Sequence, residues 1–302
     1  MTETQRILAL DIGGTHTRMG MVARGGSVSA FRRFPSARWN AGDALSNLGA
    51  LLENYLAEEA PGGAAAVSLG FPSAVDKSRR VLVNTPTIPQ LDGVAAADAL
   101  ERRLGVRVFL DRDVVMLYEH AARALGLPPS GLTACFFIGT GIGNLIVLDG
   151  EPLTGARGVA GELGHIPLHG KAGRCGCGKT GCAELYAAGH ALVRIREEHF
   201  TGERPDDLFS QHADHPAVRE YVDALAEVLA VELVILDPDR AVLGGGVVGM
   251  PGFPMDALKG GVLRRLRGDA SGMGWHIAPQ ADDAGVAGAG LYGFRILDKE
   301  NS

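Results

Sequence analysis

The sequence predicts an α/β protein with two lobes. Apolar runs of strand length alternate with helical segments along the chain, which is the order typical of α/β proteins. A strand, a Gly/Thr turn, a second strand and a glycine turn follow one another at residues 7–26, and the same order recurs at 133–150. With 302 residues the chain can form two lobes, each with a core of its own. We therefore expect an architectural repeat, with one unit in each lobe.

Hydrophobic periodicity and turn residues give the individual elements. The expected strands, with a hairpin turn at Gly25–Gly26, are 6–11, 17–23, 27–34, 64–69, 104–111, 133–138, 144–148 and 240–243. The expected helices cover about 41–59, 114–125, 215–236 and 284–297. The last of these is rich in alanine and glycine on one side, which suits close packing.

We expect the N-terminal lobe to cover residues 1–113, with the C-terminal helix, about 284–302, packing back on it. The C-terminal lobe would cover 114–283. No flexible linker separates the two halves of the sequence.

Composition and charge exclude several classes of protein. The net charge of −6 gives no basic surface for nucleic acid. No apolar stretch approaches the roughly 20 residues that span a bilayer. Strand-like sequence begins at Arg6, so we expect no signal peptide and no membrane partner. Clustered cysteines in such a chain favour a metal site over disulfides, and hence a reducing cytoplasm.

The cysteine cluster is the most specific chemical signal. Three of the four cysteines lie within eight positions: Cys175, Cys177 and Cys182. One preceding histidine, either His165 or His169, would complete a closed tetrahedral Zn²⁺ site with no position left for water. Glu162 and Glu184 flank the cluster, so we expect a structural zinc that shapes a polar pocket and does no chemistry itself. The fourth cysteine, Cys135, lies in an apolar run and is expected in the core.

Three glycine turns, each after an apolar strand, have the composition of phosphate-binding loops. Glycine allows backbone N–H groups to turn toward an anion, and threonine adds a hydroxyl donor. These turns lie at residues 11–15, 139–141 and 244–246. One nucleotide could contact all three if the lobes close on each other. The chain has neither a P-loop nor a dinucleotide-binding fingerprint.

Two aspartates follow strands at positions suited to phosphoryl transfer. Asp11 could hold Mg²⁺ on the phosphates, or it could hydrogen-bond its own turn. Asp113 could take the proton from a substrate hydroxyl, or it could cap the helix that follows. Arg112, beside it, is either a surface charge or a ligand contact.

Together these motifs resemble the ROK family of sugar kinases and repressors, within the actin and hexokinase superfamily of ATPases. The resemblance covers nearly the whole chain. Its most specific part is the pattern Gly158-x-x-Gly161-Glu162-x-Gly164-His165, followed by the cysteine cluster. It implies a two-lobed actin-like ATPase (ribonuclease H-like) fold, ATP with Mg²⁺, a structural Zn²⁺, a small-molecule sugar as substrate, and a homodimer.

The resemblance also implies roles for single residues. Asp113 would be the catalytic base. The residues implied to bind the sugar are Asn84, Arg112, Asp113, Glu162, His165 and Glu184. Those implied to bind ATP are Asp11, Gly13, Gly14, Thr15, Thr140, Gly141, Gly244, Gly245 and Gly246, with Asp11 also on the magnesium. The implied zinc ligands are His165, Cys175, Cys177 and Cys182. Because His165 is assigned to both metal and sugar, different ring atoms must face the two partners.

Departures from the glucokinase pattern point to another sugar. Arg112–Asp113 stands where ROK glucokinases usually have Asn–Asp, and Thr87–Ile88 stands where they have Asn–Leu. The segments Thr15-His16-x-Arg18, Gly70-Phe71-Pro72-x-x-Val75 and Arg112-Asp113-Val114 resemble the branch of the family that phosphorylates D-allose, a sugar that differs from glucose only at C3. A long cation in place of a short amide should change which ring hydroxyls are recognised.

We therefore expect an ATP-dependent kinase that acts on the 6-hydroxyl of D-allose. The alternatives in the same family are a glucokinase and an N-acetylmannosamine kinase. A sugar-sensing repressor or a catalytically inactive sugar binder is disfavoured. The first strand begins too early for a DNA-binding domain to precede it, and both aspartates of a kinase are present.

Overall fold

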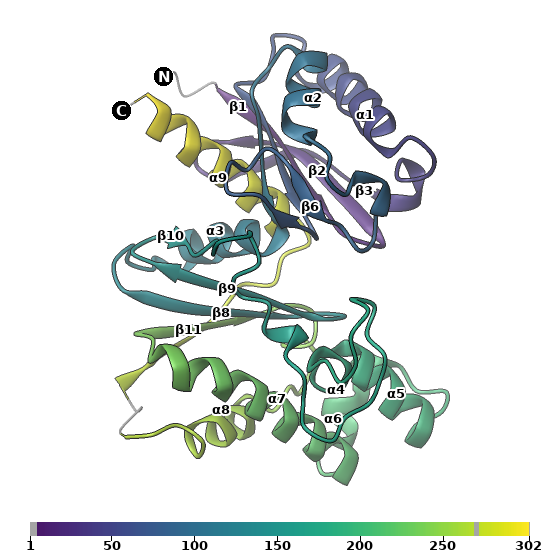
Figure 1. Ribbon diagram of the computed structural model, residues 1–302, viewed down its shortest axis with the longest axis vertical. Helices are drawn as coiled ribbons and strands as arrows, with labels where there is room; N and C mark the ends of the chain where they lie inside the picture. The colour runs from purple at the N-terminus through teal and green to yellow at the C-terminus, as the bar shows by residue number, and fades with distance from the viewer. Residues whose placement is uncertain (1–4, 269–271, 302) are drawn as a thin grey trace. The chain divides into compact units, whose positions relative to one another are not determined.

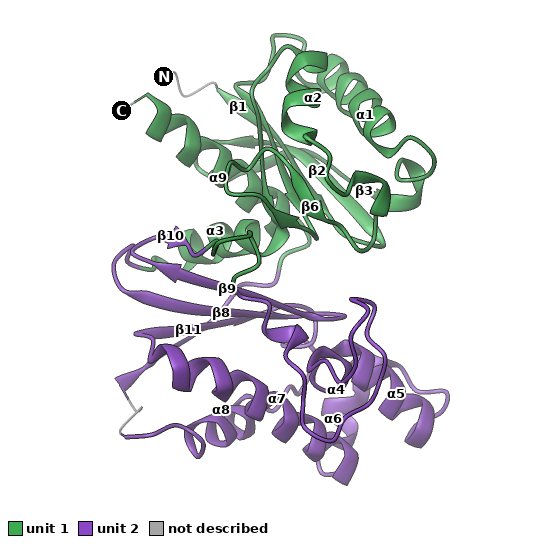
Figure 2. Ribbon diagram, viewed as in Figure 1, with its two compact units in different colours: residues 1–127, 154–160, 281–302 green, residues 128–153, 161–280 purple. Residues whose placement is uncertain are grey.

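The computed structural model describes residues 5–268 and 272–301, which form two compact units (Figure 1 and Figure 2). Unit 1 consists of residues 1–127, 154–160 and 281–302, and unit 2 of residues 128–153 and 161–280. The expected boundary at residue 113 differs from this division, which keeps the helix at Asp113–Leu125 in unit 1. Residues 1–4 and 302, at the ends of the expected N-terminal lobe, lie outside the described part.

Groups of strands and groups of helices follow one another along the chain, as expected of an α/β protein. The strands are β1 (Arg6–Ile12), β2 (His16–Ala23), β3 (Val28–Pro35), β4 (Ala66–Phe71), β5 (Ala74–Val75), β6 (Leu82–Asn84), β7 (Val108–Arg112), β8 (Leu132–Ile138), β9 (Ile142–Leu148), β10 (Glu151–Pro152), β11 (Arg240–Gly244) and β12 (Gly274–Ile277). The helices are α1 (Ala44–Glu59), α2 (Ala96–Leu104), α3 (Asp113–Leu125), α4 (Glu184–Ala187), α5 (Gly189–His199), α6 (Leu208–His212), α7 (Pro216–Leu236), α8 (Met255–Leu263) and α9 (Ala284–Glu300). No described helix is long and apolar enough to cross a bilayer.

Each unit contains a five-stranded mixed sheet, and the two sheets have the same strand order. The order is β3-β2-β1-β4-β7 in unit 1 and β10-β9-β8-β11-β12 in unit 2. In both, the first three strands pair antiparallel and the remaining pairs are parallel. The predicted architectural repeat is therefore confirmed.

Successive side chains of β1 point to opposite faces of the sheet in unit 1, and a different helix covers each face. Leu8 and Leu10 are fully buried in a cluster that includes Leu48 and Leu52 of α1. Burying a leucine side chain stabilises a fold by about 1.5–3 kcal/mol. Ile7 points to the opposite face, where α9 packs on β1 (Figure 1).

The glycines of α9 allow its close packing against α3 and the sheet. A Cβ atom on Gly288 would lie 1.7 Å from the backbone oxygen of Met116 in α3. No side chain fits at that distance, because the obstacle is backbone. The expected close packing of this helix is confirmed, and it explains why α3 belongs to unit 1.

Other predictions differ from the structure near helix ends. The strand expected at 104–111 begins only at Val108, because Leu104 is the last residue of α2 and Gly105 caps that helix with φ +66°. The helix expected from about 41 begins at Ala44, because the carboxylate of Asp43 accepts a bond from the N–H of Ser46 at 3.0 Å. Short helices such as α2, α5 and α8 were not predicted.

A carboxyl group is buried beneath the sheet of unit 2. Glu232 of α7 is 7% exposed, and its Oε1 accepts a hydrogen bond from Nδ2 of Asn144 at 2.9 Å. Burial raises the pKa of Glu232 to about 7, because the charged form is poorly solvated there. At a pH between its unfolded and folded pKa values, Glu232 is therefore protonated in the native state and ionised in the unfolded chain.

We predict that stability falls as the pH rises from about 4.5 to about 7, over the interval between the unfolded and folded pKa values. Glu232→Gln keeps an acceptor for Asn144 but has no charge. It should therefore remove this slope and raise the free energy of unfolding at pH 8 by about 1–3 kcal/mol. The measurement is urea unfolding at several pH values, with the exposed Glu197→Gln as control. Equal slopes in wild type and Glu232→Gln would contradict the prediction.

Candidate active site and metal site

The carboxyl ends of the parallel strands in unit 1 bring the predicted acidic residues to one edge of the sheet. The register aligns Asp11 of β1 with Gly70 of β4, and Gly70 with Asp111 of β7. Two strand spacings separate β1 from β7, or roughly 10 Å. A Cβ atom on Gly70 would lie 3.4 Å from the Cα of Asp113. The backbone of β4 therefore packs closely against the start of α3.

Asp11 lies at the start of the first predicted phosphate turn. Its Oδ2 accepts a hydrogen bond from Nη1 of Arg18 at 3.4 Å. This carboxylate therefore pairs with an arginine and not with the N–H groups of its own turn. Burial raises the pKa of Asp11 above its usual range, and Arg18 opposes the shift. Within the turn, Gly14 and Thr15 are exposed, and the side chain of Thr87 packs on Gly14.

Asp113 is the first residue of α3. Its Oδ1 accepts a hydrogen bond from the backbone N–H of Val114 at 2.8 Å, but Arg112 occupies the N-cap position, so Asp113 lies in the first turn and does not cap the helix. A carboxylate is favoured at a helix N-terminus by the orientation of the peptide dipoles. Beside it, Nη1 of Arg112 donates to the carbonyl oxygen of Ala160 at 2.9 Å, so Arg112 contacts the segment 154–160 and is no isolated surface charge.

Asn84 ends β6 and is exposed. Its backbone oxygen accepts from the hydroxyl of Ser73 at 2.8 Å. Sequence reasoning overlooked Asp111, which is 6% exposed and lies directly before Arg112. An acidic residue inside an otherwise apolar strand was the signal that could have identified it.

The other two predicted turns lie together in unit 2. They follow β8 and β11, which are parallel neighbours in the sheet. Gly245 has φ +89°, and a Cβ atom there would lie 2.4 Å from the carbonyl oxygen of Ile138. Only glycine allows this approach between the two turns. The residues predicted for ATP in this unit are thus gathered at one edge: Thr140, Gly141, Gly244, Gly245 and Gly246.

The loop between β10 and α4 folds the cysteine cluster with little regular structure. Residues 166–168 run beside 181–183, since the N–H of Leu168 bonds to the oxygen of Gly181 and the N–H of Ala183 to the oxygen of Ile166. A tight turn allows the N–H of Cys175 to donate a hydrogen bond to the carbonyl oxygen of Lys179 at 2.9 Å. These pairings bring the cysteines back toward the short helix that ends at His165.

Four side chains of this loop converge as possible metal ligands. The ligand atoms of His165, Cys175, Cys177 and Cys182 all lie within 4.8 Å of one another. The sulfurs of Cys177 and Cys182 are 3.6 Å apart, and Cys175 Sγ is 3.7 Å from His165 Nδ1. Zn²⁺ bonds of about 2.3 Å to sulfur and 2.0–2.1 Å to nitrogen imply separations of roughly 3.6–3.8 Å in a tetrahedron. The residues therefore fit zinc, and the histidine in the described cluster is His165.

The two ring nitrogens of His165 face different neighbours. Nδ1 faces Cys175, whereas Nε2 lies 3.7 Å from Oε2 of Glu162. One imidazole can therefore contact a metal through one nitrogen and a polar ligand through the other, as the two predicted roles require. A ligand histidine is commonly oriented through its second nitrogen in this way.

Glu184 connects the cluster to the phosphate turn of the same unit. Its Oε1 lies 3.1 Å from Cys175 Sγ, and a Cβ atom on Gly141 would lie 2.5 Å from Oε2. A metal held by the cluster would thus fix the loop that carries Glu162 and the acid that borders this turn.

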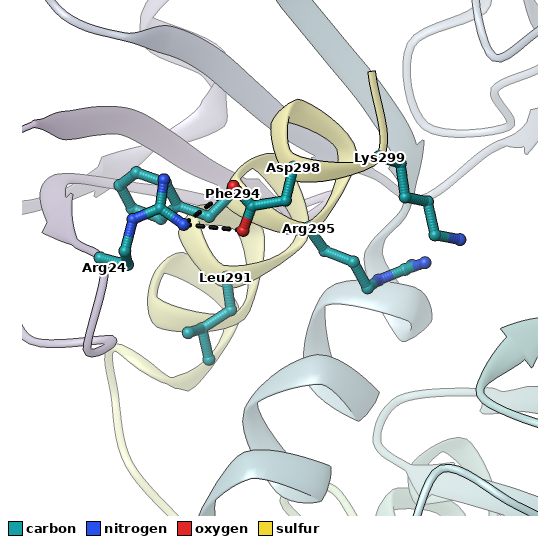
Figure 3. A pocket seen from close by; sticks show the side chains of 6 residues that line it. All are labelled: Arg24, Leu291, Phe294, Arg295, Asp298 and Lys299. Carbon is teal, nitrogen blue, oxygen red and sulfur yellow. Dashed lines mark hydrogen bonds and ion pairs between the residues drawn. The ribbon is translucent and has the colours of Figure 1, made fainter. Parts of the chain in front are cut away.

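A separate hollow of about 510 Å³ lies on unit 1, along the end of α9 (Figure 3). Arg24 spans it, donating to both oxygens of Asp298 at 3.0 and 2.7 Å and stacking on Phe294. None of the predicted site residues lines this hollow. Because Arg24 and Asp298 pair with each other and the predicted site residues lie elsewhere, we do not assign this hollow to the active site.

We predict that Cys177→Ser loses bound zinc, because three ligands hold the ion less tightly than four and the ion would then leave a loop with little other structure. The measurement is zinc per chain by elemental analysis after dialysis, together with the melting temperature. His169→Ala is the matched control, since His169 is an exposed histidine of the same loop outside the cluster. Full zinc occupancy in Cys177→Ser, or zinc loss in His169→Ala, would refute the assigned ligand set.

Comparison with known proteins agrees with this geometry. A glucokinase from Thermotoga maritima is 27% identical over 308 residues, covering 94% of this chain and 96% of the relative. An N-acetyl-D-glucosamine kinase from Aliivibrio fischeri is 30% identical, covering 78% of this chain and 82% of the relative. The crystal structure of a ROK hexokinase from Thermus thermophilus has a TM-score of 0.78 at 29% identity, covering 98% of this chain and all of that one.

The sequence model of the ROK family matches residues 7–292, nearly the whole chain. The similar solved structures have the two-sheet actin-like ATPase fold that the strand order of both units shows. The chain therefore belongs to the ROK family.

Proposed function

We propose that this chain is an ATP-dependent hexose kinase that phosphorylates the 6-hydroxyl of D-allose. The class of enzyme and the identity of the sugar rest on different observations. The class, a sugar kinase, is supported by the named relatives and by the arrangement of each unit. The sugar is supported by the residues beside Asp113.

The observation that carries the kinase proposal is the common edge of β1, β4 and β7. A glycine turn suited to phosphate and an aspartate at a helix start lie there about two strand spacings apart. A kinase needs such a pair, because one group holds the phosphates while the other prepares the attacking hydroxyl.

In the proposed reaction, the carboxylate of Asp113 takes the proton of the sugar 6-hydroxyl. The hydroxyl oxygen then bonds to the γ-phosphorus of ATP, and the bond from that phosphorus to the oxygen of ADP breaks. Bound Mg²⁺ would offset the charge of the phosphates, with Asp11 as its protein ligand, directly or through water. Positioning and charge stabilisation supply most of the rate in reactions of this kind.

Residues of unit 2 would recognise the sugar hydroxyls and the nucleotide. Glu162, Nε2 of His165 and Glu184 offer hydrogen-bonding atoms on the side of the loop that the metal would fix. The glycine turns after β8 and β11 offer backbone N–H groups for the nucleotide. The proposed zinc has a structural role only, since its four protein ligands leave no open position.

Arg112 supports D-allose over glucose as the preferred sugar. It has a rigid guanidinium that only donates hydrogen bonds, where the glucokinases of the family usually have asparagine. One of its donors already binds the oxygen of Ala160, which holds the side chain in one orientation beside Asp113. A fixed donor is suited to discriminating the configuration of one ring hydroxyl.

The experiment that tests the substrate is a coupled ADP-release assay with D-allose, glucose, fructose, N-acetylglucosamine and N-acetylmannosamine. We expect the highest kcat/KM for D-allose, by at least tenfold over glucose. A tenfold preference for glucose or an N-acetylated sugar would reject D-allose but keep the kinase. No turnover of any hexose would reject both.

We predict that Asp113→Asn lowers kcat by about 10²–10⁴-fold, because the amide cannot accept the proton. Its Oδ1 can still accept from the N–H of Val114, so the start of α3 should be retained. Sugar affinity, measured by calorimetry, should change by less than about threefold. The exposed Asp206→Asn is the control. A near-normal kcat in Asp113→Asn would remove Asp113 as the base.

A further inference from the structure

The loop between β5 and β6 holds an arginine in a backbone conformation that favours glycine. Arg79 has φ +56°. Asp76 fixes the loop around it, since its carboxylate accepts from the backbone N–H groups of Ser78, Arg80 and Val81 at 3.2, 2.9 and 2.8 Å. Left-handed backbone is costly for a residue with a Cβ atom, and it persists where the surrounding structure requires it.

The side chain of Arg79 pairs with the buried carboxylate of Asp111. Its Nε lies 2.8 Å from Oδ2 of Asp111. The hydroxyl of Tyr292, a buried residue of α9, donates to the same oxygen at 3.0 Å. The backbone N–H of Arg112 donates to Oδ1 at 2.8 Å. Both oxygens of the carboxylate are therefore bonded, and Arg79 supplies the positive charge.

This carboxylate holds the backbone that leads into Asp113. The N–H bonded to Oδ1 belongs to Arg112, one residue before the proposed base. A buried carboxylate keeps its charge and orientation only while its cation and donors are in place. Loss of the guanidinium would therefore release the junction at which β7 passes directly into α3.

A second contact also holds the junction between β7 and α3. Nη1 of Arg112 donates to the oxygen of Ala160, in the segment 154–160 of the same unit. The contribution of Arg79 must therefore be measured against an anchor that remains when Arg79 is replaced.

We propose that Arg79 is a positioning residue, which acts through Asp111 to hold the junction between β7 and α3 and hence the backbone of Asp113. The proposal rests on the proposed function only for its catalytic consequence. Arg79 touches neither substrate in this mechanism. Its role is to keep the last residue of β7 in one conformation.

The test compares Arg79→Gly, Arg79→Lys and Tyr292→Phe with the wild type by hydrogen exchange. Glycine accepts the positive φ, so Arg79→Gly removes the charge without adding backbone strain. We expect the amide protons of Arg112 and Val114 to exchange at least tenfold faster in Arg79→Gly, while those of β1 stay within threefold. Arg79→Lys should stay within threefold at all these amides. Tyr292→Phe, which keeps the ion pair, should give an intermediate increase.

Kinetic constants form the second readout. Arg79→Gly should lower kcat at least tenfold, with the KM for ATP within threefold, because the phosphate turn is not disturbed. Lys77→Gln, an exposed cation of the same loop, should match the wild type.

The outcomes separate this proposal from the proposed function. Faster exchange in a protein whose wild type phosphorylates no hexose would keep the positioning role and reject the kinase. An active wild type with unchanged exchange or unchanged kcat in Arg79→Gly would overturn the positioning role. Faster exchange throughout β1 as well would indicate general destabilisation and would also overturn it. If Arg79→Gly fails to fold, Arg79→Asn takes its place, because asparagine also tolerates a positive φ and carries no charge, and unchanged exchange in that variant overturns the proposal.

Discussion

Parallel pairing of the central strands is the constraint on which the candidate site depends. Parallel strands end at the same edge of a sheet, so turns that are far apart in the sequence are brought together there. In unit 1 this constraint gathers Asp11, Gly70 and Asp111 in one register, and in unit 2 it gathers the turns after β8 and β11. Glycine then matters for a steric reason, since Gly245 touches the backbone of Ile138.

Two buried acids of the chain show how differently a carboxyl group can be accommodated. Glu232 accepts a hydrogen bond from an uncharged amide, and burial raises its pKa to about 7. Asp111 instead has a guanidinium and two hydrogen-bond donors around its two oxygens. The first arrangement leaves stability dependent on pH, whereas the second fixes the backbone beside the proposed base. Burial alone therefore does not determine what an acid does in this fold.

The metal cluster lies in a part of the chain that has little regular structure. The loop at residues 161–183 has one short helix at Leu163–His165, tight turns and isolated strand bridges, so little regular structure orders its side chains. Four converging ligands can replace that missing order. The consequence extends to Glu162 and Glu184, because His165 and Cys175 are their direct neighbours.

Much of the fold could be predicted from the sequence, since most central strands of the two sheets are apolar runs that end near glycine, whereas the edge strands β10 and β12 were not predicted. The three cysteine ligands were equally accessible, because their spacing is a property of the sequence, whereas the residues alone left the histidine ligand open between His165 and His169 and the structure places His165 in the cluster. The start of β7 was placed too early because the apolar Leu104 continues the pattern of the strand although it ends α2. The partners of Asp111 could not be predicted at all. Arg79 and Tyr292 lie far from it in the sequence, and only the packing of α9 and the β5–β6 loop brings them together.

The central claim is that Asp113 acts on a sugar hydroxyl. The most direct measurement is a crystal structure of the chain with D-allose and a non-hydrolysable ATP analogue. We predict a carboxylate oxygen of Asp113 within about 2.6–3.2 Å of the sugar 6-hydroxyl, with that hydroxyl directed at the terminal phosphate. A sugar bound with its 6-hydroxyl out of reach of Asp113, and close to another acid, would contradict the account.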